Sequence, residues 1–438
     1  MVVNRELSRR QLLGLGAGAA AVAALAPFGA AAALASPVAG TGKGRLIPQG
    51  KVGTITFTQR DVPGRIGIAA SAALGQDPVM GYLGGADFPA DPTDLGPLVP
   101  LPGGWYELLQ FLANAGFHQI EFAGYGQNAN NPGGTASYPG DHNATGRANY
   151  IAYAQRLRAF LDEFGLEAIG NHGFIPNTWF GPNSSGGTMS ANDELRYKTE
   201  LEFAAILGMP YMGTGNDPTS ANNRNIEPWT IACEKWTALN EISVNQFGIH
   251  LYPHNHSPAY NFLQDGPMVT VTVNRQTGLP LATPQVVRGE SGKRLMQHYL
   301  DNTEPSLVVI EMDIYWAHVA QHQHRWRYDW EGNRVEDIFD PLATVAQQTQ
   351  RYALYHAKDG DRTAQAPGSG DGYTMIPFGD PRSDIDYATF FKEQGAKGYH
   401  NPNYEQDNAP GGNATPEGRG QSLRFAVISG NNMVNLRG

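Results

Sequence analysis

Acidic and histidine residues follow short apolar segments in the C-terminal half of this sequence. Residues 306–316 read SLVVIEMDIYW, so four apolar residues are followed at once by Glu311 and Asp313. A continuous apolar run of this kind predicts a strand buried on both faces, as in a parallel sheet. In barrels of alternating strands and helices, the carboxyl end of such a strand is where the chemistry takes place. The two acids are therefore candidates for a reactive site.

The same arrangement recurs along the chain. Candidate ligands stand at the ends of four consecutive predicted strands: His254 and His256, Glu311 and Asp313, His356, and Glu405. Imidazoles and carboxylates without a thiolate suit a divalent metal ion, with Mn²⁺ as the first choice and Co²⁺, Fe²⁺, Mg²⁺ or Zn²⁺ as alternatives. Because the strand ends of a barrel converge on one mouth, we expect a metal site there. The pattern leaves open which member of each pair is the ligand.

Other side chains near the predicted strand ends are candidates for contact with a substrate. They are Glu121, His172, Asp217, His256, Trp316 and Lys358. Trp316 would stack on the apolar face of a substrate ring. The alternative for Asp217 is a helix cap, and for Lys358 it is an ion pair with Asp313 or Asp359.

The elements that must position these residues alternate regularly. We predict eight strands, at residues 52–59, 118–123, 166–171, 210–215, 249–252, 306–313, 352–356 and 398–405, separated by helical patterns. A count of eight favours a closed (β/α)8 TIM barrel, of class α/β, over a doubly wound sheet. Residues 264–292 interrupt the pattern and predict an inserted β-hairpin, and long Gly/Pro-rich loops complete the domain. Neither GxGxxG nor GxxxxGK[ST] is present, which argues against a nucleotide-binding loop.

Composition and the first residues restrict the function further. The 438-residue chain has a formal net charge of -10 and no basic cluster, which argues against a nucleic-acid partner. Arg9 and Arg10 precede an Ala/Gly-rich apolar run and a small-residue cleavage site, so residues 1–35 predict a twin-arginine signal peptide. Residues 36–50 then form a linker and residues 51–438 a single domain. We expect an exported protein, extracellular or in the cell envelope, without a stable membrane anchor. Cys233 excludes an intrachain disulfide because it is the only cysteine.

Four segments resemble the xylose-isomerase-like TIM barrels, the sugar (phosphate) isomerase/epimerase family. They read YPHNH at 252–256, EMDIYW at 311–316, YHAKD at 355–359 and NYEQD at 403–407. The resemblance implies metal ligands His254, Asp313, His356 and Glu405, with His254 in place of the usual Glu and His256 as its alternative. It implies catalytic roles for Glu405 and His254, with Glu405 as the base, and leaves Glu311 a supporting acid.

The predicted function follows from these groups. A divalent ion acidifies the carbon beside a sugar carbonyl or hydroxyl, and a carboxylate or imidazole can then move the proton. We expect an exported, metal-dependent isomerase or epimerase of a non-phosphorylated sugar or glycoside. The alternatives are a metal-dependent lyase or hydrolase of 3-keto-glycosides, and a non-catalytic sugar-binding barrel. The endonuclease branch of the barrel is disfavoured by the acidic charge.

Overall fold

The computed structural model describes residues 44–60, 62, 87–89, 98–100, 105–124, 144–176, 189–362, 373–395, 401–409 and 421–438. The predicted signal peptide at 1–35 and part of the predicted linker lie outside these ranges. Among the helices described, none combines the length and the apolar character that crossing a bilayer would require.

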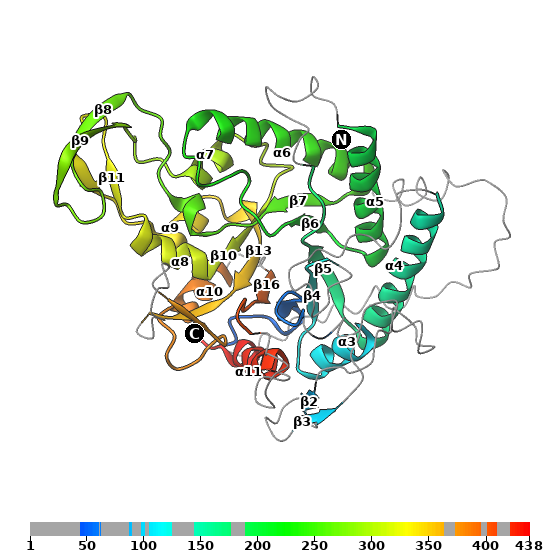
Figure 1. The fold of residues 1–438 in the computed structure, drawn as a ribbon. Coiled ribbons are helices and arrows are strands. Elements are labelled where there is room, and N and C mark those ends of the chain that lie inside the picture. Colours follow the sequence, from blue (N-terminus) through cyan, green and yellow to red (C-terminus); the bar gives the residue numbers. More distant parts are fainter. Residues whose placement is uncertain are drawn as a thin grey trace.

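Eight parallel strands form the centre of the molecule (Figure 1). They are β1 (Gly53–Ile55), β4 (Gln119–Phe122), β5 (Glu167–Asn171), β6 (Tyr211–Thr214), β7 (His250–Pro253), β10 (Ile310–Asp313), β13 (Tyr352–Ala357) and β16 (Asn401–Tyr404). Six of them pair in the order β10-β13-β16-β1-β4-β5, and β6 pairs with β7. Parallel bridges between His172 and Gly213 and between His254 and Glu311 join the two sheets at both ends. The strands therefore close into the predicted (β/α)8 barrel.

Helices surround this barrel on the outside (Figure 1). Their bounds are α3 (Trp105–Asn114), α4 (Ala144–Phe164), α5 (Ala191–Leu207), α6 (Ile226–Phe247), α7 (Leu295–Asp301), α8 (Ile314–Gln323), α9 (Pro341–Gln347), α10 (Tyr387–Gly395) and α11 (Gln421–Asn435). Capping residues fix the ends of α5, because the Ser190 side chain accepts a hydrogen bond from Asp193 N and Gly208 closes the helix with φ 78°. Short 3-10 turns are η2 (Gln49–Lys51), η3 (Ser257–Tyr260) and η4 (Thr349–Arg351).

Two predicted strands are shorter than expected, and one helix was missed. The first strand ends at Ile55 and continues as turns, and β10 begins only at Ile310, after turns at 305–307. The missed helix is α8, at residues 314–323, which starts directly after β10. Asp313 makes this possible, because its Oδ1 accepts a hydrogen bond from Trp316 N at 2.9 Å and so caps the helix. The strand end is thus also a helix start.

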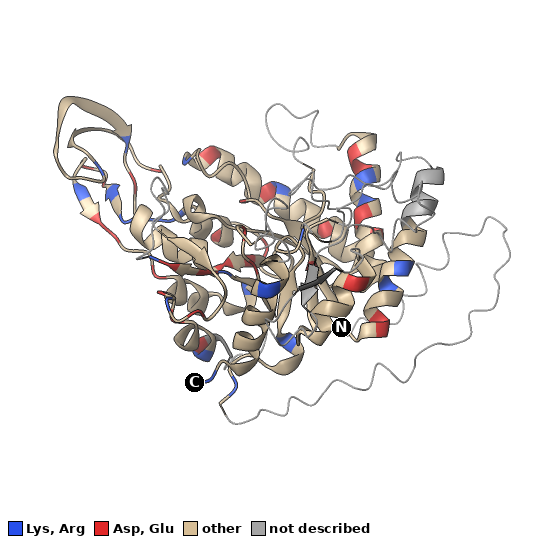
Figure 2. Ribbon diagram, turned by 60° about the horizontal axis from the view of Figure 1, so that its bottom comes forward, with Lys and Arg blue, Asp and Glu red and all other residues tan. Residues whose placement is uncertain are grey.

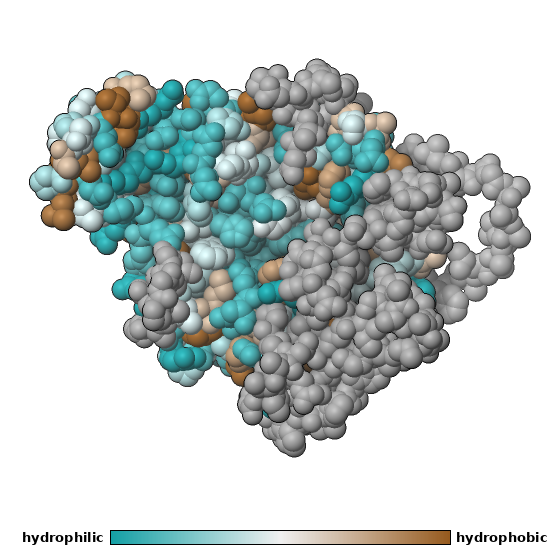
Figure 3. All heavy atoms as spheres, in the orientation of Figure 1, coloured by the Kyte–Doolittle hydropathy of each residue, from teal (hydrophilic) through white to brown (hydrophobic). Residues whose placement is uncertain are grey.

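The predicted insertion is confirmed as an antiparallel hairpin of β8 (Met268–Val273) and β9 (Pro280–Arg288). A second hairpin, β11 (Trp326–Tyr328) with β12 (Arg334–Glu336), packs against it through a hydrogen bond from the Tyr328 hydroxyl to Val273 O at 2.6 Å. Apolar side chains are exposed on the outlying β8–β9 hairpin, where brown spheres mark the surface (Figure 3). Two further small pairs are β2 (Asp87–Pro89) with β3 (Leu98–Pro100), and β14 (Asp359–Asp361) with β15 (Thr374–Ile376).

The core between barrel and helices is apolar, with a few buried polar links. Arg351 is 1% exposed and donates hydrogen bonds to Val308 O, Leu300 O and Thr303 Oγ1 at 2.8, 3.0 and 2.6 Å. It thereby ties the segment before β10 to the end of α7. Cys233 is buried on α6, and burial raises the pKa of its thiol to about 12, which disfavours a nucleophilic role. On the outer helices, acidic and basic residues are interspersed (Figure 2).

Candidate metal centre at the barrel mouth

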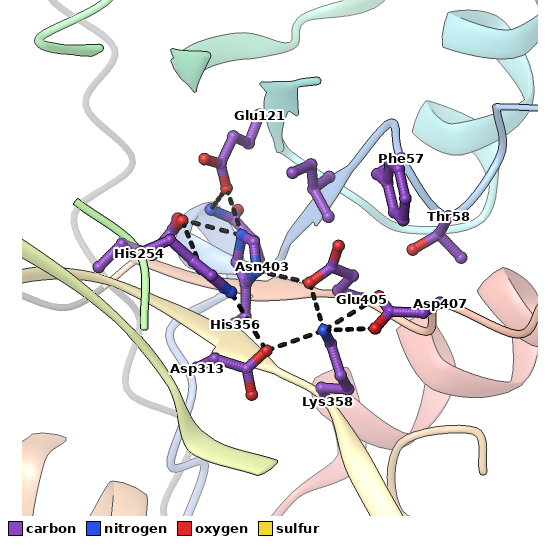
Figure 4. A network of polar contacts seen from close by, with 12 residues as sticks. Phe57, Thr58, Glu121, His254, Asp313, His356, Lys358, Asn403, Glu405 and Asp407 are labelled. Carbon is purple, nitrogen blue, oxygen red and sulfur yellow. Dashed lines mark hydrogen bonds and ion pairs between the residues drawn. The ribbon is translucent and has the colours of Figure 1, made fainter. Parts of the chain in front are cut away.

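The carboxyl ends of four consecutive strands bring the predicted ligands together. His254 follows β7, Asp313 ends β10, His356 lies in β13 and Glu405 follows β16 (Figure 4). One potential ligand atom from each of the four lies within 4.8 Å of the others. All four side chains are buried, with at most 4% exposure. We call these residues the outer set.

The two histidines of the outer set each have one ring nitrogen near a carboxylate of the same set. The other ring nitrogen lies near a carboxylate deeper in the barrel. His254 Nε2 lies 3.6 Å from Asp313 Oδ2, and His356 Nδ1 lies 2.6 Å from Glu405 Oε2. The opposite nitrogens, His254 Nδ1 and His356 Nε2, each lie 3.1 Å from an oxygen of Glu311. A carboxylate that accepts the proton of one ring nitrogen leaves the lone pair of the other nitrogen available to a metal ion.

Glu311 also belongs to a second potential ligand group, which we call the inner set. This group consists of His172, His254, Glu311 and His356, and His172 Nε2 lies 2.9 Å from Glu311 Oε2. Our prediction placed Glu311 in a supporting position only. Its two-residue spacing from Asp313 in a strand puts both acids on the same face of β10, directed into the barrel at successive levels. That spacing is the sequence signal from which an inner set could have been found.

Glu121 was expected to contact a substrate, and the structure places it elsewhere. Its carboxylate is fully buried, accepts a hydrogen bond from Asn403 Nδ2 at 3.0 Å and lies 2.9 Å from His356 Nε2. The Tyr252 hydroxyl donates to its other oxygen. Burial and the neighbouring Glu311 raise the pKa of Glu121 to about 7, and His356 partly offsets them. These contacts place Glu121 beside His356 and not among the described residues that line a cavity.

Lys358 is the cationic member of the site. Its Nζ lies 2.8 Å from both Asp313 Oδ2 and Glu405 Oε2, and 3.0 Å from Asp407 Oδ1 (Figure 4). Burial alone would lower its pKa, but the three carboxylates outweigh burial and hold the pKa well above its usual value. Lys358 is therefore an ammonium group, and the ion pair with Asp313 that we weighed against substrate contact is present. Burial raises the pKa of Asp313 to about 6, against the opposing effect of Lys358.

The residues of the outer set fit a divalent cation. Asp313 Oδ2, His356 Nδ1 and Glu405 Oε2 are buried and, within the described part of the chain, have no partner in hydrogen-bond geometry. Four buried carboxyl groups gather here, those of Glu121, Glu311, Asp313 and Glu405. Among the described residues, they face the Lys358 ammonium and His356, whose pKa the carboxylates hold well above its usual value in spite of burial. Buried charge of one sign is costly unless a counter-charge is present. The mixed nitrogen and oxygen donors suit Mn²⁺, Fe²⁺, Co²⁺ or Zn²⁺.

A cavity of about 380 Å³ lies above the outer set. Of the predicted substrate contacts, His172, His256 and Lys358 line it, as do the ligand candidates His254 and Glu405. Two charged lining residues were not among our predicted site residues: Arg60, whose Nη2 donates to Asp407 O at 2.8 Å, and Asp407 itself. No motif in the sequence marked Arg60, because its position depends on the turns after β1.

The remaining predicted contacts lie around this cavity. Asp217 lines a neighbouring cavity, and its Oδ1 accepts a hydrogen bond from His256 N at 2.8 Å. Trp316 packs edge-on against His256 with ring centroids 5.7 Å apart, but it is not among the described residues that line either cavity. The structure therefore places Trp316 beside the site, where it supports His256.

The chain was compared with known proteins. No family model and no curated protein matches the sequence. Solved structures with a similar fold include a sugar phosphate isomerase/epimerase from Parabacteroides distasonis, with 20% identity, TM-score 0.44, and coverage of 74% of this chain and 88% of that one. The probable 3-DHS dehydratase AsbF from Bacillus anthracis has 11% identity, TM-score 0.44 and coverage of 86% and 98%. The 3-keto-D-glucoside 4-epimerase YcjR from E. coli has 12% identity, TM-score 0.37 and coverage of 79% and 95%.

Proposed function

We propose that this protein is a divalent-metal-dependent isomerase or epimerase of a non-phosphorylated sugar. One observation carries the proposal: His254, Asp313, His356 and Glu405 converge from four successive strands, and two of them, His254 and Glu405, line a cavity large enough for a small molecule. Carboxylate and imidazole groups around one point suit proton transfer at a carbon beside a carbonyl. When bound, a divalent ion would polarise that carbonyl or hydroxyl oxygen and so acidify the neighbouring carbon.

Glu405 is the proposed base. Its carboxylate lines the cavity, and its pKa lies well below the usual value because Lys358 and His356 outweigh the effect of burial. An ionised carboxylate can accept the proton when the C–H bond of the sugar breaks. The electron pair of that bond moves toward the adjacent carbonyl oxygen. Return of the proton to the neighbouring carbon, or to the opposite face, gives an isomer or epimer of unchanged mass.

Lys358 and the buried carboxylates support this step. The Lys358 ammonium lines the same cavity and can donate a hydrogen bond to a sugar oxygen on which negative charge develops. Glu311 accepts a hydrogen bond from His254 Nδ1 and Glu121 accepts one from His356 Nε2, so the two carboxylates fix the orientation of these rings. His256 and His172 would contact substrate hydroxyl groups from the cavity wall.

The proposal includes Mn²⁺ as the ion, with His254, Asp313, His356 and Glu405 as its ligands. It also includes export through the twin-arginine pathway, which the residue pattern at 1–35 supports. A protein exported after folding would carry a metal ion acquired in the cytoplasm. Export also makes a free sugar or glycoside a more suitable substrate than a phosphorylated metabolite.

Incubation of the protein with a panel of sugars and keto-sugars in D₂O, with added Mn²⁺, tests this function by NMR. We expect loss of one carbon-bound proton signal in at least one sugar, with a product of the same mass. The Glu336→Gln variant is the control, because it changes an exposed acid on the β11–β12 hairpin. It should give the same exchange of sugar protons for deuterium as the wild type. Absence of exchange across the whole panel would refute the proposal, and release of an aglycone would point to a lyase instead.

A further inference from the structure

A second cavity adjoins the one above the outer set. It measures about 750 Å³, and His172, Gly173, Thr214 and Asn216 line both cavities. The other described residues that line it come from the end of β5 and the segment after it, from α5, from the segment between β6 and α6, and from α6, with Gly124 and Pro258 beside them. Both volumes lie in the range of about 300–1,000 Å³ that is usual for small-molecule sites. A substrate bound at the outer set could therefore extend into the second cavity.

Lys235 is the unusual residue of the second cavity. It lies on α6, lines the cavity and is only 9% exposed. Among the residues that the structure describes, its amine has no ion pair or hydrogen bond, and only the Trp236 ring lies nearby, 6.0 Å from Nζ. Burial lowers the pKa of Lys235 to about 8, so the amine is still mostly charged at neutral pH. A buried ammonium without a counter-charge is costly, and a bound anion would remove that cost.

A second cation lines the same cavity from α5. The Arg196 guanidinium lies over the Phe174 ring, 3.9 Å from its centroid, and its Nε has no hydrogen-bond partner within the described ranges. The two described acids that line the cavity, Glu200 and Asp217, have interactions of their own. Asp217 accepts a hydrogen bond from His256 N, and Glu200 has an interaction of its own. Lys235 and Arg196 thus remain for a ligand.

We propose that the second cavity is a subsite for the carboxylate of an acidic sugar, with Lys235 as its main contact. This inference rests on the proposed function, because it assigns the substrate class of the same site. The charges favour a monoanion over a phosphate, since two carboxylates line the cavity beside the two cations. A dianion would be repelled by these acids more strongly than a carboxylate. A carboxylate also matches a single ammonium, with which it forms a charge-assisted hydrogen bond.

Calorimetric titration of the full-length protein with D-glucuronate, D-glucose and D-glucose 6-phosphate tests the subsite. We expect glucuronate to bind at least ~10-fold more tightly than glucose, the preference that one charge-assisted hydrogen bond supplies. Lys235→Met should abolish the preference, whereas Lys293→Met, which removes an exposed lysine paired with Asp301, should retain it. The preference should also weaken above pH 8, where Lys235 loses its charge.

Three results would overturn the subsite. The first is an equal affinity for glucuronate and glucose in the wild type. The second is a glucuronate preference that persists in Lys235→Met, and the third is Lys235-dependent binding of glucose 6-phosphate that is tighter than that of glucuronate. The outcome is separable from that of the proposed function: a Lys235-dependent preference without any exchange in D₂O would support the subsite and refute the isomerase.

Discussion

Replacement of Glu311 by Gln removes one negative charge from the inside of the barrel while the shape of the side chain is preserved. Glu311 is fully buried and lies within 3.1 Å of ring nitrogens of His172, His254 and His356. The Glu311 carboxylate accepts hydrogen bonds from His172 and His254 and lies beside His356 as an ion-pair partner, whereas the amide of a glutamine has one oxygen and an NH₂ group that faces the remaining donors. The histidines of the outer set would therefore lose part of the support that orients them.

The expected loss of metal affinity follows from the position of Glu311. If the ion binds at the outer set, Glu311 is one contact removed from it, and loss of such a partner weakens binding by about 10- to 100-fold. This corresponds to about 1.4–2.8 kcal/mol. Competition of the purified variant with a chelator for Mn²⁺ measures the change directly. Circular dichroism would show that the fold is retained, and Glu336→Gln, which removes an exposed acid paired with Arg325, is the matched control.

Two results would refute this reasoning. Unchanged affinity would show that Glu311 does not support the ligands. A loss as large as that of Asp313→Asn would show that Glu311 binds the ion itself, which places the metal in the inner set with His172.

Three further changes test other parts of the account. Asp313→Asn should lose Mn²⁺ with the fold intact, and full metal occupancy by elemental analysis would exclude Asp313 as a ligand. Arg351→Met breaks three buried hydrogen bonds and should lower the free energy of unfolding in urea by about 3 kcal/mol; a change below about 1 kcal/mol would contradict this. Lys235 has a folded pKa of about 8, below its ordinary value of 10.5, so the folded state binds its proton less tightly than the unfolded chain. Wild-type stability should therefore rise as pH increases from about 8 to about 10.5, and Lys235→Met should be more stable than wild type at pH 7 by up to about 3 kcal/mol. Parallel stability profiles of the two proteins over that pH range would show that burial does not destabilise the Lys235 ammonium.

The barrel and the convergence of the outer set were predictable because they depend on order along the chain. Eight apolar segments alternate with helical patterns, and parallel strands end on one side of a barrel. Polar residues that follow successive strands must then meet. The register confirms this for Asp313 and His356, which are direct partners across β10 and β13.

The rest depends on tertiary structure that has no local signal. Helix α8 was missed because Asp313 serves as strand end, cap and ligand candidate, so no loop residues separate β10 from α8. Glu121 was assigned to the substrate because a sequence does not show how deep in a barrel a strand residue lies. Lys235 was missed because a lysine in a helical pattern is usually exposed, and its burial arises only from the packing of α6 against the barrel.

The position of the ion tests the central claim most directly. A crystal of the Mn²⁺-loaded protein, with anomalous scattering measured at the manganese edge, would locate it. The account predicts a peak within ligand distance of His254 Nε2, His356 Nδ1 and the carboxylates of Asp313 and Glu405. A peak between His172 and Glu311, or none in the barrel mouth, would contradict it.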